Sequence, residues 1–281
     1  MKQFDSHRFA TLVKWHLVSN RRELLNSFFF LTIVFFVMMM FLTQVVHHGD
    51  SYVWQEAVLV NYSHSVHQSM DAALFCIAVI LIGGASRIFR NMKETRQRTT
   101  FLMLPASNLE KWLLRFLHAT LLLFLLASLA LVTADVVRML LAPLWNRPLV
   151  SGVALLLSDI GGGQAPADDV PTALITAAVV GVVLLQHATF VLGGTLFRKS
   201  PFLLTCLAVF LLSVLTGQLL HDTEFSNGLT LVGYDDRTGL YVSPWIHAGT
   251  IGCYLVAVLF YWLSYKLFCR MQVINNKWLN V

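Results

Sequence analysis

The stretch from Phe28 to Val46 reads FFFLTIVFFVMMMFLTQVV and contains no Asp, Glu, Lys or Arg. A helix rises about 1.5 Å per residue, so about 20 apolar residues cross a hydrocarbon core that is about 30 Å thick. We therefore expect this stretch to form a transmembrane helix, and it decides the fold class.

Five further stretches have the same apolar character: Asp71–Phe89, Leu113–Val137, Thr172–Phe197, Pro201–Leu220 and Ala248–Phe268. Of the 281 residues, 57% are hydrophobic and only 12% are charged, which excludes an ordinary soluble domain. We expect an all-α integral membrane protein with six transmembrane helices and a single polytopic domain over residues 1–281. The spans are expected at 28–46, 71–89, 113–137, 172–197, 201–220 and 248–268. The four cysteines lie in or beside these spans and are expected to be reduced thiols.

The basic residues indicate the orientation of the spans. Seventeen of the 20 Lys and Arg residues fall on the side of the membrane that also holds both termini, and only Arg138, Arg147 and Arg237 fall on the other side. Positive charge collects in cytoplasmic connections, so both termini are expected in the cytoplasm. Because the charges flank spans, orientation and anionic lipid explain them, and no nucleic-acid partner is expected.

Residues 1–26 precede the first span and carry a helical pattern. Phe9, Leu12, Val13 and Leu17 recur at helical spacing, and basic residues lie between them. Such a helix would lie in the membrane interface, with Trp15 as an amphipathic anchor. The alternative is a basic flank that is helical only because it continues the first span.

The connection between the second and third spans reads RNMKETRQRTTFLMLPASNLEKW over residues 90–112. Ser107 and Glu110 have the spacing of a capping box, which predicts the start of the helix that continues into the third span. The four apolar residues before Pro105 are expected to be exposed and to need a partner, either lipid or a cytoplasmic protein.

At Arg96–Lys111, and in the wording LMLPASNLEKWLLRFL, the chain resembles the permease subunits of type-2 ABC transporters, in particular a divergent branch found in Bacteroidetes. That family has six spans after an N-terminal interfacial helix, with a cytoplasmic coupling helix between spans two and three. The resemblance implies that Phe101, Leu102, Met103 and Leu104 form the apolar part of the coupling helix. It also implies that Arg96, Arg98 and Glu110 are available for polar contacts to the ATPase.

The resemblance implies the partners as well: a separate ABC ATPase subunit, a second copy of this permease or a homologous permease, and membrane lipid. The chain contains no G-x-x-x-x-G-K-[ST] motif, so ATP and Mg are expected in the partner ATPase. We expect no cofactor on this chain and no enzymatic activity of its own. The few polar residues in the spans favour an amphiphilic substrate that is exported or flipped.

Ionisable and polar residues inside spans are costly and are candidates for function. Asp135 and Arg138 lie three residues apart near the outer end of the third span, where they would either anchor the helix or form part of a gate. Gln186 and His187 lie near the middle of the fourth span. They would either form interhelical hydrogen bonds or line a translocation path.

Two other classes of function stay open. Six of the ten histidines fall on the outer side, and the His64–His67 pair has a spacing that suits metal ligands, which would make the chain a metal- or haem-binding membrane protein. The other class is a membrane scaffold or sensor that does not transport. No catalytic motif is present.

Overall fold

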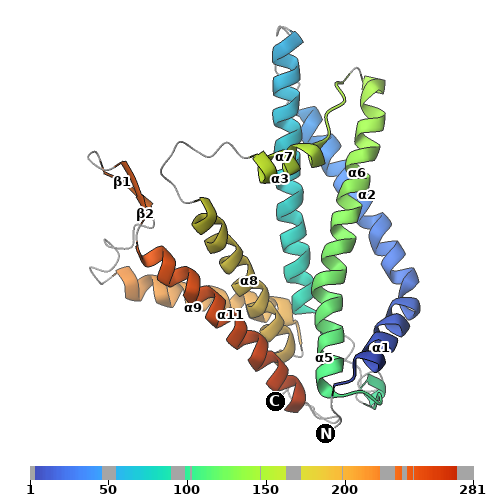
Figure 1. Ribbon diagram of the computed structural model, residues 1–281, viewed down its shortest axis with the longest axis vertical. Coiled ribbons are helices and arrows are strands. Elements are labelled where there is room, and N and C mark those ends of the chain that lie inside the picture. Colours follow the sequence, from blue (N-terminus) through green and yellow to red (C-terminus); the bar gives the residue numbers. More distant parts are fainter. Residues whose placement is uncertain are drawn as a thin grey trace. The chain divides into compact units, whose positions relative to one another are not determined.

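The computed structural model describes residues 4–45, 55–89, 99–101, 103–145, 147–162, 172–197, 199–221, 232–235, 239–242 and 244–270. These residues are helical except for turns and one short hairpin (Figure 1). The chain divides into two compact units, which we describe separately. The α2–α6 unit comprises Ala10–Leu81 and Thr120–Gln164, and the α8–α11 unit comprises Met1–Phe9, Ile82–Ala119 and Ala165–Val281.

The α2–α6 unit is built on the packing of α2 (Arg21–Val45) against α6 (Leu123–Leu141). The buried residues of α2 are Leu31, Phe35, Met39 and Thr43, which recur every four residues. The facing residues of α6 include three buried alanines, Ala127, Ala130 and Ala134, whose small side chains allow the larger ones of α2 to approach. Met70, Ala73 and Ile77 of α3 (Gln55–Ser86) complete this core.

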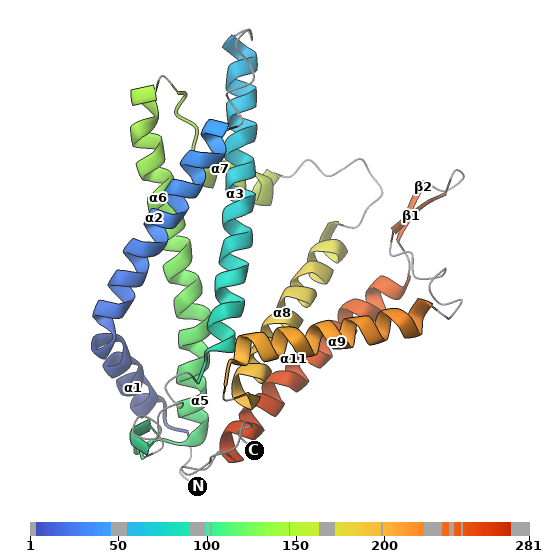
Figure 2. The same cartoon turned by 180° about the vertical axis from the view of Figure 1, so that it is seen from behind.

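The α8–α11 unit contains α8 (Thr172–Leu196), α9 (Pro201–His221) and α11 (Pro244–Arg270), and both α9 and α11 pack against α8 (Figure 2). Close approach depends on two glycines of α8. A Cβ at Gly193 would lie within 2.8 Å of the Cγ2 of Thr205 on α9, and a Cβ at Gly194 would lie 2.7 Å from the carbonyl oxygen of Ser86. Ser200 has a left-handed backbone (φ 48°) in the tight turn that leads to Pro201 at the start of α9.

A long helical segment connects the two units in sequence. It begins as α5 (Asn108–Leu117), passes through a π-helical turn at His118–Leu122 and continues as α6. The division between the units falls inside the π-helical turn, between Ala119 and Thr120. The α-helix ends at Leu141, two residues before Pro143, and a 3₁₀ turn follows at Ala142–Trp145.

Among the described residues, five helices are long and apolar enough to cross a membrane: Arg21–Thr43, Leu59–Ser86, Asn108–Trp145, Thr176–Leu196 and Ile246–Arg270. These helices confirm the expectation of a helical membrane protein with several spans. The α9 helix, expected as a sixth span, is also apolar and is 21 residues long. The helix α3 begins at Gln55, well before the apolar stretch expected from Asp71, so most of the expected connection 47–70 is helix.

Three elements outside the expected spans complete the description. The N-terminal helix α1 covers Ser6–Ser19 and ends just before α2. The helix α7 covers Gly152–Gly162, inside what was expected to be a connection between spans. An antiparallel hairpin pairs β1 (Val232–Asp235) with β2 (Gly239–Val242) and is a small exception within the expected all-α class.

Candidate functional site

In the connection between α3 and α5, the described residues 99–101 and 103–106 form a compact turn, which we call the α3–α5 turn. The backbone amide of Met103 donates to the carbonyl of Thr99 (3.0 Å), and that of Ala106 donates to the carbonyl of Leu104 (2.8 Å). Three of the expected partner-contact residues, Arg96, Arg98 and Leu102, lie outside the described residues. The α3–α5 turn is therefore described through Phe101, Met103 and Leu104.

The side chain of Phe101 is buried, which corrects the expectation that all four apolar residues are exposed. Only 6% of its surface is exposed, because it packs edge-to-face against Phe268 of α11, with ring centroids 6.4 Å apart. Phe89, three residues after the end of α3, belongs to the same cluster and stacks on Phe268 with ring centroids 5.0 Å apart. The guanidinium of Arg115 lies 4.7 Å from the centre of the Phe101 ring, within the range of a cation–π interaction. Phe101 thus anchors the turn.

Met103 projects from the turn. It is 78% exposed, whereas Leu104 is half-buried against the same aromatic cluster. An exposed, flexible and polarizable side chain on an anchored turn is suited to contact with a partner. Of the described apolar residues here, Met103 is the one that matches the expected exposure.

The predicted capping box is confirmed. The backbone amide of Glu110 donates to Oγ of Ser107 (3.2 Å), and the amide of Ser107 donates to Oε2 of Glu110 (2.8 Å). These two bonds satisfy amides that an uncapped helix would leave unpaired. Sequence spacing alone was enough to predict this start of α5, because both contacts are local.

The carboxylate of Glu110 makes three further contacts that sequence spacing did not predict. Its Oε1 accepts from the amide of Asp5 (2.9 Å) and from Nη2 of Arg8 (2.6 Å), and its Oε2 accepts from Nε of Arg8 (3.0 Å). Arg8 therefore binds the carboxylate with both arms of its guanidinium. The expectation that Glu110 is available to a partner protein is wrong in this structure, since its side chain has no exposed surface.

The electrostatics of Glu110 follow from these contacts. Glu110 precedes the expected span at Leu113, and the hydrogen bond from Arg8 lowers the pKa of its carboxyl group to about 2, against the opposing effect of burial. The amides of Asp5 and Ser107 lower the pKa further. The same hydrogen bond raises the pKa of Arg8. The pair is therefore ionised at neutral pH.

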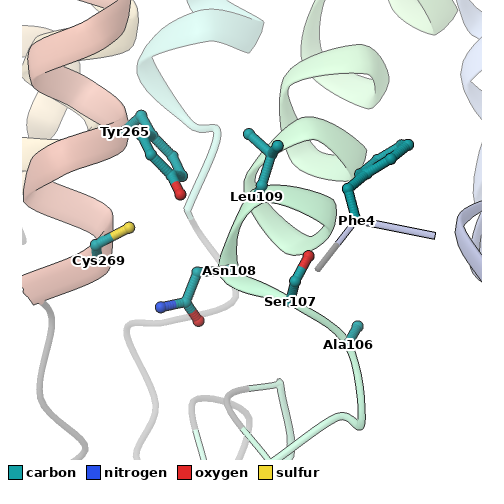
Figure 3. A pocket seen from close by; sticks show the side chains of 7 residues that line it. All are labelled: Phe4, Ala106, Ser107, Asn108, Leu109, Tyr265 and Cys269. Carbon is teal, nitrogen blue, oxygen red and sulfur yellow. The ribbon is translucent and has the colours of Figure 1, made fainter. Parts of the chain in front are cut away.

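A pocket of about 360 Å³ lies beside this site (Figure 3). Asn108 and Leu109 of α5 line it together with Tyr265 and Cys269 of α11. Phe4, Ala106 and Ser107 supply the rest of the wall. Sequence analysis did not single out Phe4, Tyr265 or Cys269, since no local pattern connects positions so far apart in the chain.

Asp135 and Arg138 form the expected ion pair near the C-terminal end of α6. Both are almost completely buried, at 2% and 1% exposed. Nη2 of Arg138 lies 2.6 Å from Oδ1 of Asp135 and 2.7 Å from the carbonyl oxygen of Val150. Nη1 of Arg138 donates to the hydroxyl of Tyr62 (2.9 Å) on α3. Each nitrogen of the guanidinium thus has an acceptor, as a buried charge requires.

The same ion pair holds the start of α7. Oδ2 of Asp135 accepts from the hydroxyl of Ser151 (3.0 Å) and from the amide of Val153 (3.1 Å). The Ser151 hydroxyl in turn accepts from the amide of Ala154 (3.2 Å), which is an N-cap interaction. A carboxylate at a helix N-terminus also faces the positive end of the helix dipole. The pair therefore fastens α7 to α6.

Gln186 and His187 do not act together. Gln186 is exposed, whereas Nδ1 of His187 lies 2.8 Å from the hydroxyl of Tyr261 on α11. Phe116 packs edge-on against the His187 ring at 6.1 Å. Nε2 of His187 is buried and has no hydrogen-bond partner among the described residues. The contacts of His187 therefore bear out interhelical hydrogen bonding between α8 and α11.

His64 and His67 each contact a residue one turn further along α3. Nε2 of His64 lies 3.1 Å from the side-chain nitrogen Nε2 of Gln68, and Nδ1 of His67 lies 3.2 Å from Oδ2 of Asp71. Within the described part of the chain, no group of three or more His, Cys, Asp or Glu side chains is placed to hold a metal ion.

No family model, no curated protein and no solved structure matches this chain. The class of protein is thus defined by its own helices, which are those of a multi-pass α-helical membrane protein.

Proposed function

We propose that this chain is the membrane-spanning permease subunit of an ATP-driven ABC transporter. The observation that carries the proposal is the α3–α5 turn, which presents the exposed side chain of Met103 on an anchored base. Phe101 holds one end of the turn in the aromatic cluster, and the capping box at Ser107 and Glu110 holds the other. A contact surface supported by packed residues loses little conformational entropy when a partner binds.

The proposed membrane topology has six spans with both termini in the cytoplasm of a bacterium. The helix α9 is the sixth span, in addition to the five long apolar helices. The surplus of Lys and Arg on the side of the α3–α5 turn supports this orientation. The proposed location is the inner membrane, and it places Met103 where a soluble ATPase can reach it.

The proposed mechanism assigns the chemistry to the partner. The ATPase closes when it binds ATP and Mg, and its movement pushes the α3–α5 turn. Two permease chains, each on its own ATPase, would then alternate between conformations open to either side. The apolar spans with few polar groups favour an amphiphilic substrate, which is exported or flipped between leaflets.

Association with an ATPase tests the proposal. The tagged chain is coexpressed with the ABC-type ATPase encoded nearest to it, and the complex is purified in detergent. Met103→Asp places a charge in the proposed contact and is expected to lower the recovered ATPase by more than about tenfold. Leu144→Asp is the matched control, because Leu144 is equally apolar, is 74% exposed and lies at the opposite end of the long helix.

Two outcomes would contradict the proposal. In the first, the unmodified chain recovers no ATPase under conditions in which it remains monodisperse. In the second, Met103→Asp and Leu144→Asp recover equal amounts of ATPase, so that the association does not involve the α3–α5 turn.

A further inference from the structure

Glu110 is bonded to the first turns of two different helices, α5 and α1. We infer that Glu110 and Arg8 are positioning residues that make the N-terminal helix α1 move together with the α3–α5 turn when a partner presses on it. The inference rests on the proposed function, since it assumes that an ATPase binds this turn. It extends that function by assigning α1 to the moving part of the protein.

The start of α1 is held by a local helix cap and by contacts to Glu110. The carboxylate of Asp5 accepts from the amides of His7 (3.0 Å) and Arg8 (3.4 Å), which caps α1 locally. The amide of Asp5 itself donates to Glu110, and the side chain of Arg8 reaches the same carboxylate. The first turn of α1 is thus joined to Glu110 by one backbone bond and one bidentate ion pair.

The backbone between Met103 and Glu110 is short and restrained. Only four residues separate Met103 from Asn108, where α5 begins, and one of them is Pro105, whose backbone φ is fixed by its ring. The amide of Ala106 is bonded within the turn, and the amide of Ser107 is bonded to Glu110. Because the backbone between them has little conformational freedom, a displacement of Met103 is expected to displace Glu110 as well.

The helix α1 is continuous with α2, the first long helix. The amide of Asn20 donates to the carbonyl of His16 (3.1 Å), and the amide of Leu24 donates to the carbonyl of Asn20 (3.0 Å). The side chain of Asn20 also donates to the carbonyl of His16 (2.9 Å). Helical hydrogen bonding thus passes through the junction between α1 and α2, so a movement of the first turn of α1 is carried along the chain towards the first span.

The contribution of Arg8 can be separated from that of the helix cap. Arg8→Gln removes the bidentate ion pair but leaves the carboxylate of Glu110 with the amides of Asp5 and Ser107, so the start of α5 is retained. Arg8→Lys keeps the charge but offers a single point of contact, and it should restore part of the connection. Arg22→Gln removes the same charge from an exposed position on α2 and is the matched control.

Hydrogen exchange with and without the partner tests the inference. The purified chain in lipid nanodiscs is measured alone and with the nearest-encoded ABC-type ATPase. In the unmodified chain and in Arg22→Gln, the ATPase should slow exchange at residues 99–107 and, by about fivefold or more, at residues 6–12. In Arg8→Gln the effect at 99–107 should remain and the effect at 6–12 should disappear. Arg8→Lys should give an intermediate effect.

The outcomes distinguish the two levels of the account. If the ATPase still slows exchange at residues 6–12 in the Arg8→Gln variant, the inference is overturned while the proposed function stands. The inference is also overturned if Arg22→Gln loses the effect at 6–12 as fully as Arg8→Gln does. If the ATPase changes exchange nowhere in the unmodified chain, the proposed function fails, and the inference fails with it.

Discussion

At the scale of single residues, the structure shows how a charge is accommodated at the edge of a very apolar protein. Glu110 is fully buried, yet four donors surround its carboxylate: two backbone amides and two nitrogens of Arg8. An unpaired buried carboxylate would be strongly destabilising, and the four contacts offset the free-energy cost of burying this one. The interaction is therefore expected to depend on the charge of Glu110.

The first prediction concerns pH. The folded pKa of Glu110, about 2, lies below its ordinary value of 4.5, so its contacts stabilise the fold fully above about pH 4.5 and lose this effect as the pH falls towards 2. Thermal midpoints in detergent should show that Glu110→Gln is less stable than the unmodified chain by a constant amount between pH 5 and 7. That difference should shrink below about pH 4.5. A difference that grows on acidification would contradict this.

The second prediction concerns Gly194 of α8. A Cβ there would lie 2.7 Å and 2.8 Å from the carbonyl oxygens of Ser86 and Ala85, and backbone atoms cannot move aside as side chains can. Gly194→Ala is expected to lower the free energy of unfolding by about 1–3 kcal/mol. Gly252→Ala is the control, because a Cβ at Gly252 meets no atom within 4 Å and alanine favours the helix. Equal thermal midpoints for the two variants would refute the close contact.

At the scale of elements, the long helices follow directly from the apolar stretches, but their ends do not. The start of α8 at Thr172 and the end of α6 at Leu141 were predictable, because a proline lies beside each. The start of α3 was not, since polar residues such as Asn61, His64 and Gln68 interrupt the apolar residues between Gln55 and Met70. Hydropathy marks where a helix can cross a membrane, which is a different boundary from where the helix begins.

The candidate site divides in the same way. The capping box was predictable because Ser107 and Glu110 are three residues apart, as was the pairing of Asp135 with Arg138. The contact of Glu110 with Arg8 joins residues 102 positions apart in the chain, and Phe101 and Phe268 are still further apart in the sequence. Such contacts depend on tertiary packing, which no local pattern in one sequence reveals.

The third prediction concerns the fastening of α7 to α6. Arg138→Leu leaves the carboxylate of Asp135 buried without its cation and is expected to cost about 3–5 kcal/mol of stability. The double variant Asp135→Leu/Arg138→Leu removes both charges and should be more stable than Arg138→Leu alone. Chemical unfolding in detergent measures both. A double variant that is less stable than Arg138→Leu would show that the pair is not what holds these elements.

At the scale of the whole molecule, the protein combines a membrane part with a turn that we propose binds a partner. The five long apolar helices define the membrane part, and the α3–α5 turn with Met103 is the proposed contact. Each compact unit contains its own core of apolar side chains.

The fourth prediction concerns topology. In a cysteine-free background, Leu144→Cys is expected to react with a membrane-impermeant maleimide added outside intact cells, because Leu144 is exposed at the end of the long helix assigned to the outer side. Met103→Cys, which is similarly exposed, should react only after the cells are opened. The reverse pattern of labelling would invert the orientation and remove the α3–α5 turn from the reach of a cytoplasmic ATPase.

The composition of the complex that this chain forms shows whether it is an ABC permease subunit. Native mass spectrometry of the chain purified together with the ABC-type ATPase encoded nearest to it gives that composition. We expect a single assembly of two permease chains, or this chain and a homologous permease, with two ATPase subunits. A chain that emerges from the membrane with no ATPase bound, in preparations where the ATPase is present and folded, would contradict it.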